Sequence, residues 1–352
     1  MKYSFKIGSL WGIPVELHIT FILLLIVVAF LSAYYFLLFV CLFFFVTIHE
    51  LSHSIVAKHY NIKVRKIILY PIGGVSEIEE IPEKPGIEWR VAVAGPLVSF
   101  AIGLLLLTLD RLIPIKLPFA EALPFVATAQ TLIYDLAILN LILGGFNLIP
   151  AFPMDGGRIL RAFLAERMKF SDATKYAAFV GKILGILMAL FGILYSLWLV
   201  VIGIFIYIGA TEETESTIIS TTMAQVRVKD VMYSEVASVK PETTLSEALE
   251  VMFKARYHDV LVEKDGIFQG IVTWNEIIKV RREQREQLRV EQLPMKQTSV
   301  FSDEPILEAY KIMLREKIDL VPVVEREMPS KVVGVVTSES LAYAYEKAKA
   351  LR

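Results

Sequence analysis

Long apolar runs fill roughly the first 210 residues of the chain, and a mixed, charged sequence follows them. Several runs approach the ~20 residues that a helix needs to cross a bilayer. The pattern predicts six membrane-spanning helices, at residues 18–31, 33–57, 88–109, 124–148, 173–194 and 196–210. The last two meet at residues 194–197, so we expect a tight helical hairpin there.

The second half contains an internal repeat, which is the first feature to look for in such a region. The stretch SEALEVM at 246–252 matches LEAYKIM at 307–313, and VLV at 260–262 matches VPV at 321–323, each 61 residues on. The stretch GIVT at 270–273 then matches GVVT at 334–337. Each copy has the pattern of helix, strand, turn, strand and helix, so a soluble α/β unit in two repeats is predicted.

Composition supports this division into a membrane part and a soluble part. Hydrophobic residues make up 55% of the 352 residues, and a mean hydropathy of +0.56 is too apolar for an ordinary soluble domain. We therefore predict a helical membrane domain at 1–211, a linker at 212–225, and repeats at 226–280 and 281–352. A net charge of −1 gives no indication of nucleic-acid binding. A single cysteine excludes an intramolecular disulfide, and we expect the first span to be retained rather than cleaved as a signal peptide.

Lysines and arginines in the loops predict the orientation in the membrane. Thirteen of them lie in the N-terminal segment and in the second-to-third and fourth-to-fifth connections, against two, Arg111 and Lys116, on the opposite side. Both termini are therefore expected in the cytoplasm, in a multi-pass protein of the cell membrane. The second and fourth spans then both run inward, and His49 lies roughly 12 Å below the cytoplasmic boundary.

The second span carries an unusual polar group, His49-Glu50-Leu-Ser-His53, after the apolar run FFFV. Two histidines four residues apart lie on one face of a helix and can bind the same metal ion. A glutamate beside them can accept a proton from water, as in H-E-x-x-H zinc hydrolases. The alternative is a helix with ordinary surface histidines, but polar side chains are costly at bilayer depth. We therefore predict a hydrolytic zinc site.

A catalytic zinc needs a third protein ligand and one open position. Two aspartates compete for this role: Asp155 where the fourth span ends, and Asp135 deeper inside that span. Asp155 is favoured because irregular backbone at membrane depth occurs where it lines a cavity. Asp155 could also serve as the N-cap of a helix that starts at Gly156. His59 points away, because it lies about 280° around the helix from His49.

Taken together, HELSH and NLIPAFPMDGGR (147–158) resemble the site-2 protease family of intramembrane zinc metalloproteases, peptidase family M50. The resemblance covers roughly residues 8–210. It implies one zinc ion held by His49, His53 and Asp155, with Glu50 as the general base. Asn147 matches a family asparagine that contacts the scissile peptide or the developing oxyanion, and a backbone cap at the end of the span is the alternative. The implied substrate is a single-span membrane protein that is cleaved within its transmembrane segment.

Two further segments are similar to parts of that family. Residues 66–76 alternate β-prone positions and resemble its membrane-associated β-loop, whose edge could align an extended substrate by strand addition. An ordinary hairpin is the alternative. Residues 94–99, AGPLVS, resemble the third-span motif, where small residues let helices approach closely. We assign that segment to packing and not to chemistry.

The two repeats resemble CBS domains, which pair into modules that often bind adenine nucleotides. The resemblance implies a site for ATP, ADP or AMP near Thr273, Glu276 and Thr337. The acid that usually binds ribose three residues after each threonine is replaced here by Glu276 and Ser340. Nucleotide binding and a purely structural or dimerising role, in a homodimer formed through these domains, are therefore both open.

Two functions compete at this stage. The first is an intramembrane zinc endopeptidase regulated by a cytoplasmic CBS pair. The alternative is a CBS-regulated ion channel or metal transporter, in which Asp135, Asn140 and Lys182 line a pathway. Glu50 favours the protease, because a transporter needs no carboxylate next to the first histidine.

Overall fold

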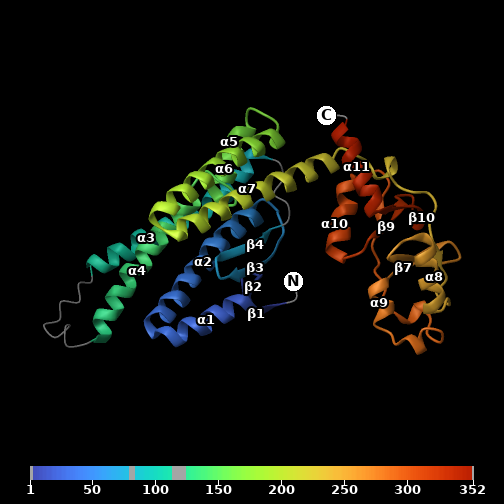
Figure 1. The fold of residues 1–352 in the computed structure, drawn as a ribbon, viewed down its shortest axis with the longest axis horizontal. Coiled ribbons are helices and arrows are strands. Elements are labelled where there is room, and N and C mark those ends of the chain that lie inside the picture. Colours follow the sequence, from blue (N-terminus) through green and yellow to red (C-terminus); the bar gives the residue numbers. More distant parts are fainter. Residues whose placement is uncertain (1–2, 79–83, 113–123, 351–352) are drawn as a thin grey trace. The chain divides into compact units, whose positions relative to one another are not determined.

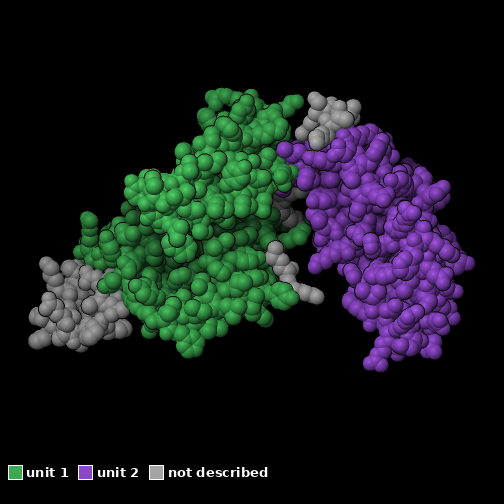
Figure 2. All heavy atoms as spheres, in the orientation of Figure 1, with its two compact units in different colours: residues 1–215 green, residues 216–352 purple. Residues whose placement is uncertain are grey.

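The computed structural model describes residues 3–78, 84–112 and 124–350, the side chains of residues 124–130 and 349–350 excepted. Two of the basic residues counted above for the orientation, Lys2 of the N-terminal segment and Lys116, lie outside these residues. The chain divides into two compact units, residues 1–215 and 216–352, which Figure 2 shows in green and purple. This division falls inside the segment 212–225 that the sequence predicts to be a linker.

The first unit is built from helices of mostly apolar sequence (Figure 1). They are α1 (Ile19–Leu31), α2 (Ala33–His59), α3 (Pro85–Leu112), α4 (Pro124–Asn147), α5 (Asp155–Ala165), α6 (Phe170–Tyr195) and α7 (Leu197–Met223). Within the described residues α2, α3, α6 and α7 are long and apolar enough to cross a membrane, whereas α1 and the described part of α4 are shorter. Helices therefore occupy all six predicted positions, and the number of spans stays a prediction.

A small sheet packs against α2 and contains the segment predicted as a β-loop. Its strands β1 (Ser4–Leu10), β2 (Ile13–His18), β3 (Val64–Tyr70) and β4 (Gly73–Ile78) lie in that order. The β1–β2 hairpin is not predicted by the sequence analysis, which assigns no structure to the residues before the first span at 18–31. Its turn has positive φ at both Trp11 (47°) and Gly12 (76°), as a tight two-residue hairpin turn requires.

The predicted hairpin of the last two apolar helices is confirmed. Only Ser196, in an extended conformation, separates α6 from α7. A Cβ added at Gly203 would lie 2.4 Å from the carbonyl oxygen of Gly185, so the two helices touch backbone to backbone. However, α7 continues to Met223. The helix therefore runs past residue 210, the predicted end of the span, and most of the segment predicted as a linker is helical.

The second unit confirms the internal repeat. The first repeat contains β5 (Ser238–Val239), α8 (Leu245–Ala255), β6 (Asp259–Lys264), β7 (Ile267–Thr273) and α9 (Trp274–Ile278). The second contains β8 (Val300–Phe301), α10 (Ile306–Glu316), β9 (Leu320–Glu325), β10 (Met328–Thr337) and α11 (Ser338–Ala350). In each repeat the short strand pairs in parallel with the middle strand, and the third strand pairs antiparallel to it.

The segment that follows α7 docks on the second repeat before the first repeat begins. Met223 and Val228 are buried in the core of the second repeat. The backbone of this segment is also bonded there, from Val228 N to Glu304 O (2.9 Å) and from Ile306 N to Val226 O (2.8 Å). Met223, the last residue of α7, and the segment after it are therefore part of the core of the second unit, residues 216–352.

A buried carboxyl group joins the two repeats. Asp259, at the start of β6, accepts a hydrogen bond from the backbone N–H of Asp319 at 2.5 Å and is only 3% exposed. The pKa of Asp259 is raised to about 6, mainly by burial and also by the charge of Asp319. The backbone hydrogen bonds and nearby His258 act in the opposite direction and lower this pKa.

We expect Asp259→Asn to stabilise the second unit at neutral pH. The pKa is higher folded than unfolded (about 3.9), so the folded state binds more protons between these values and the free energy of unfolding falls as pH rises through that window. Asparagine keeps a carbonyl acceptor without the charge, so unfolding of residues 216–352 should cost roughly 1–3 kcal/mol more at pH 7.5 and much less extra at pH 4. Urea unfolding at both pH values measures this. The exposed Asp230→Asn is the control, and an equal effect at both pH values would contradict the expectation.

Candidate metal centre

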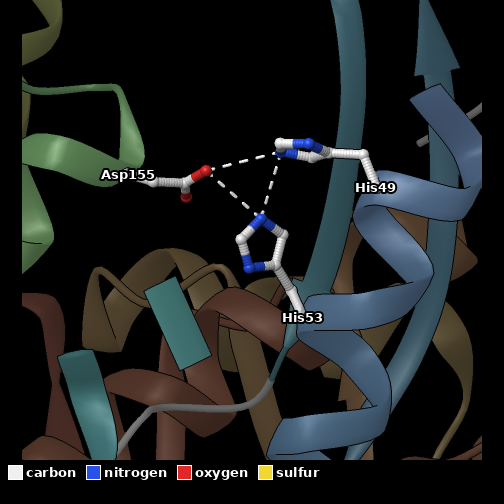
Figure 3. A group of neighbouring side chains, drawn as sticks. All are labelled: His49, His53 and Asp155. Carbon is white, nitrogen blue, oxygen red and sulfur yellow. Dashed lines mark hydrogen bonds and ion pairs between the residues drawn. The ribbon is translucent and has the colours of Figure 1, made fainter. Parts of the chain in front are cut away.

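Three side chains from two helices converge at one point (Figure 3). His49 and His53 are buried on one face of α2, and their Nε2 atoms lie 3.2 Å apart. Asp155, the first residue of α5, places Oδ2 3.4 Å from Nε2 of His49 and 3.2 Å from Nε2 of His53. The ligand atoms of the three residues lie within 4.8 Å of one another, which is close enough for them to share one metal ion.

The other nitrogen of each imidazole is held by α3. Nδ1 of His49 lies 2.8 Å from Oγ of Ser99, and Nδ1 of His53 lies 2.7 Å from the carbonyl oxygen of Val91. The carbonyl can only accept, so His53 carries its proton on Nδ1 and presents a free lone pair on Nε2. Such partners fix the orientation and tautomer of metal-binding histidines.

Gly95 of α3 leaves the space that a metal ion would need. A Cβ added at this position would lie 2.2 Å from Nε2 of His53 and 2.5 Å from Nε2 of His49. The glycine therefore faces the ligand atoms directly. The assignment of residues 94–99 to packing alone is incomplete, because Gly95 shapes the centre and Ser99 bonds to one of its histidines.

We expect Gly95→Ala to abolish metal binding. The added methyl group would occupy the space between the imidazole nitrogens, and both rings would have to turn away. Zinc content of the purified variant, measured by elemental analysis, checks this result. Gly86→Ala is the matched control on the same helix, because a Cβ at Gly86 meets nothing within 4 Å. If Gly95→Ala contained as much zinc as the unmodified protein, the interpretation that Gly95 leaves room for the metal ion would be contradicted.

Asp155 is positioned by a tightly folded segment between α4 and α5. A Cβ at Gly156 would lie 2.2 Å from the carbonyl oxygen of Ile149, and one at Gly157 would lie 2.6 Å from the backbone nitrogen of Phe152. Only glycine permits this close approach. The alternative role of Asp155 as an N-cap is wrong, because α5 begins at Asp155 and its N-cap is Met154.

Glu50 lies beside the histidines and is held by the sheet. Its Oε2 accepts a hydrogen bond of 2.8 Å from Oγ of Ser76 in β4. A Cβ at Gly74 would lie 2.5 Å from Cγ of Glu50, so β4 packs directly on this side chain. The carboxylate, both histidines and Asp155 line one cavity of about 280 Å³, which β4 and Asn147 also border.

Four other polar residues that the sequence analysis names in the spans each make a contact outside the group of three ligands. Asn147 borders the cavity and donates from Nδ2 to the carbonyl oxygen of Leu143 at 3.0 Å. Asp135, the competing third ligand, instead accepts from Oη of Tyr34 at 2.5 Å. Asn140 donates to the carbonyl oxygen of Leu136, and Nζ of Lys182 lies 5.7 Å from the ring centroid of Tyr207. The structure therefore brings Asp155, and not Asp135, to the two histidines.

The donor set fits zinc. Two imidazole nitrogens and one carboxylate oxygen are the ligands of many catalytic zinc sites, which keep a fourth position open. Here the Nε2 atoms of His49 and His53 converge, the Nδ1 atom of each histidine is hydrogen-bonded, and a cavity adjoins the two rings. Among the described residues, His49, His53 and Asp155 form the group of side chains that could hold a metal ion.

The residues predicted to bind a nucleotide cap helices in the second unit. Oγ1 of Thr273 accepts from the backbone N–H of Glu276, whose carboxylate pairs with Lys279. Thr337 and Ser340 bond to each other reciprocally, through Oγ1 to N and N to Oγ, and both are buried. Ser340 is thus committed to a helix cap. The first repeat also has a cavity of about 440 Å³, with Tyr257, His258 and Trp274 in its lining, but the lining does not include Thr273 or Glu276.

Comparison with known proteins decides the family. The sequence pattern of peptidase family M50 matches residues 37–125 and 112–191, and that of the CBS domain matches residues 228–283 and 290–347. A zinc metalloprotease of Methanocaldococcus jannaschii is 40% identical over 278 residues, which cover 77% of this chain and 78% of that protein. The chain belongs to peptidase family M50. It is a zinc-dependent protease with a CBS domain pair, and its family, rather than any one contact, excludes the transporter alternative.

The chain is similar to two further proteins. A zinc metalloprotease of Mycobacterium tuberculosis is 28% identical over 313 residues, covering 84% of this protease and 76% of that protein. The solved structure of the site-2 protease from Methanocaldococcus jannaschii matches with 47% identity and a TM-score of 0.47, covering 60% of this chain and 95% of that one.

Several residues of this centre are missed by sequence reasoning. Ser76 and Gly74 lie in a segment predicted only as a substrate edge, and Val91 contributes its backbone carbonyl, which no side-chain pattern reveals. Ser99 carries a signal, since a serine in an apolar helix needs a partner. Its distance of 50 residues from His49 conceals which partner that is.

Proposed function

We propose that this protease is an intramembrane zinc endopeptidase that cleaves transmembrane segments of single-span membrane proteins. His49, His53 and Asp155 would hold one zinc ion per subunit, and Glu50 would act as the general base. The observation that carries the proposal is the convergence of three ligand atoms within 4.8 Å beside a cavity bordered by Glu50. Both histidines lie on α2 and their hydrogen-bond partners lie on α3, and both helices are apolar enough to cross a membrane.

Zinc bound at this site would lower the pKa of a bound water to about 7 and polarise the scissile carbonyl group. Glu50 would accept the proton of the attacking water and deliver it to the leaving amine nitrogen. Ser76 supports this role, because its hydroxyl orients one carboxylate oxygen of Glu50. Asn147 borders the same cavity, so its amide is available to stabilise the developing oxyanion.

Strand β4 supports strand addition as the way in which substrate binds. It lies at one edge of the sheet and pairs with β3, and its residues Gly74, Val75, Ser76 and Ile78 border the cavity. An unwound substrate segment could add as a further strand, because an edge strand offers unpaired backbone groups. Its scissile peptide would then lie next to Glu50.

The loop charges support a place in the cell membrane with six spans and both termini in the cytoplasm. In this arrangement the lipid bilayer surrounds the apolar helices, and the zinc site opens on the cytoplasmic side. Exposed apolar side chains on α6 and α7, such as Leu194, Leu197 and Trp198, fit a lipid environment.

The CBS pair would regulate this activity by binding ATP, ADP or AMP in the first repeat. The cavity of the first repeat offers aromatic walls for a base, from Tyr257 and Trp274, and a cationic side chain for phosphate, from Arg256. Glu276 remains the candidate for the ribose. Dimerisation through the CBS domains is the alternative role of the pair.

The experiment is cleavage of a single-span substrate by the full chain in liposomes. A chelator should abolish cleavage, and added zinc should restore it. A titration of ATP, ADP and AMP should change the rate, and removal of the residues after Gln225 should eliminate that response while the zinc site stays intact. A rate unaffected by chelator would reject the zinc mechanism. A full chain indifferent to millimolar nucleotide would reject the ligand and favour dimerisation.

A further inference from the structure

A buried arginine holds the helix that carries Asp155. Arg161 is in α5, six residues after Asp155, and is only 7% exposed. Its guanidinium donates to Oε1 of Glu88 from Nε at 2.7 Å and from Nη2 at 2.5 Å. Nη1 donates to Oε1 of Glu213 in α7 at 2.6 Å. One side chain thus ties α5 to two other helices.

Arg161 also fixes the segment that precedes Asp155. The guanidinium lies 5.0 Å from the ring centroid of Phe152 and 4.8 Å from that of Phe170. Phe152 is fully buried three residues before Asp155. The ligand is therefore held from both sides in the sequence, by Phe152 before it and by Arg161 after it.

The partner Glu88 belongs to the helix that orients both histidines. Glu88 is 1% exposed and begins a buried stripe on α3 that continues through Ala92 and Gly95 to Ser99. The carbonyl of Val91, on the turn between, accepts from His53. The Arg161–Glu88 ion pair therefore connects α3, which is hydrogen-bonded to both histidines, with α5, which carries Asp155.

Stability alone does not account for this ion pair. Burying charges costs desolvation energy, and replacing a buried pair by apolar residues is often neutral or stabilising. Moreover, Oε2 of Glu88 has no hydrogen-bond partner among the residues that the structure describes. Such a pair fixes the positions of the two helices that it joins, because the planar guanidinium group of arginine determines the direction of its hydrogen bonds as well as their length.

We infer that Arg161 is a positioning residue of the metal centre, which sets Asp155 between His49 and His53 through its pair with Glu88. The inference rests on the proposed zinc site. Asp155 depends on such a clamp because residues 148–154, which connect α5 to α4, form no helix or strand. The two histidines, one turn apart on a long helix, need no comparable support.

Zinc affinity of the full chain, measured by competition with a chromophoric chelator, tests the inference. Arg161→Lys keeps the charge but loses the fork, and Glu88→Gln with Arg161→Met removes both charges together. Each should weaken zinc binding about 10–100-fold, an effect as large as that of losing a hydrogen-bond partner of a metal ligand. Arg167→Lys, an exposed arginine over Phe163, is the matched control and should leave the affinity unchanged.

A double-mutant cycle separates positioning from a general structural effect. In an Asp155→Asn background the Arg161 variants should change zinc affinity less than threefold, because the group they position is gone. An equal loss in both backgrounds, or a melting temperature that falls without any loss of zinc affinity, would overturn the inference. Asp155→Asn that by itself retains full affinity would instead reject the proposed zinc site. Cobalt in place of zinc gives a visible spectrum that should change in Arg161→Lys.

Discussion

Glu50→Gln is expected to abolish proteolysis while zinc stays bound. The substitution leaves His49, His53 and Asp155 untouched and removes only the carboxylate that accepts the proton. Loss of a general base typically lowers the rate about 10²–10⁴-fold. The neutral amide can still accept the hydrogen bond of Ser76, so the fold around β4 should persist. Zinc content and cleavage rate should be measured on the same preparation.

The matched control is Glu77→Gln, which changes a carboxylate on the same strand that does not border the cavity. It should retain both zinc and activity. Normal cleavage by Glu50→Gln at normal zinc content would show that another group takes the proton, and the proposed mechanism would fail.

Asp155→Asn is expected to release zinc, whereas Asp135→Asn is expected to retain it. Asp155 brings an oxygen within 3.4 Å of both Nε2 atoms, so its carboxylate is placed to complete the ligand set. Since losing an outer partner already costs about 10–100-fold in affinity, losing this ligand should cost about 10²-fold or more.

Asp135→Asn is the control, because it removes a carboxylate charge from α4, the helix that precedes α5 and Asp155. Its carboxylate bonds to Tyr34, and asparagine can keep that hydrogen bond. Loss of zinc from Asp135→Asn together with retention by Asp155→Asn would reverse the assignment of the third ligand.

Local patterns in the sequence predict the helices and the two histidines. A spacing of four residues places His49 and His53 on one face of α2, and apolar runs of sufficient length give the helices. The repeat in the second half is likewise visible, because each copy carries the same pattern of helix and strands. These features depend on residues near one another in the chain.

Contacts between distant segments are not predictable in the same way. Ser99 and Val91 reach the histidines across 50 and 38 residues, and Arg161 meets Glu88 across 73. A one-dimensional pattern records that these residues are polar or small, but not which partner each one meets. Asp155 is the intermediate case, since a break in an apolar run indicated an unusual site without giving its geometry.

The β1–β2 hairpin and the length of α7 are missed for a different reason. Residues Ser4–Leu10 and Ile13–His18 precede the predicted first span at 18–31, and these two short segments carry no periodic pattern long enough to predict strands. The sequence after residue 210 is rich in Thr, Ser and Glu, which are weak indicators of a helix end, yet α7 continues to Met223. In α7, Thr211 and Thr214 bond to the carbonyl four residues before them, so their hydroxyl groups are satisfied within the helix.

The central claim is tested most directly by locating the cut in a single-span substrate. The full chain and the substrate are placed in the same liposomes, and the products are analysed by mass spectrometry with and without a zinc chelator. The account predicts product ends inside the apolar segment of the substrate that disappear with chelator and in Glu50→Gln. Cleavage confined to the soluble flanks of the substrate, or cuts in the apolar segment that persist without zinc, would contradict it.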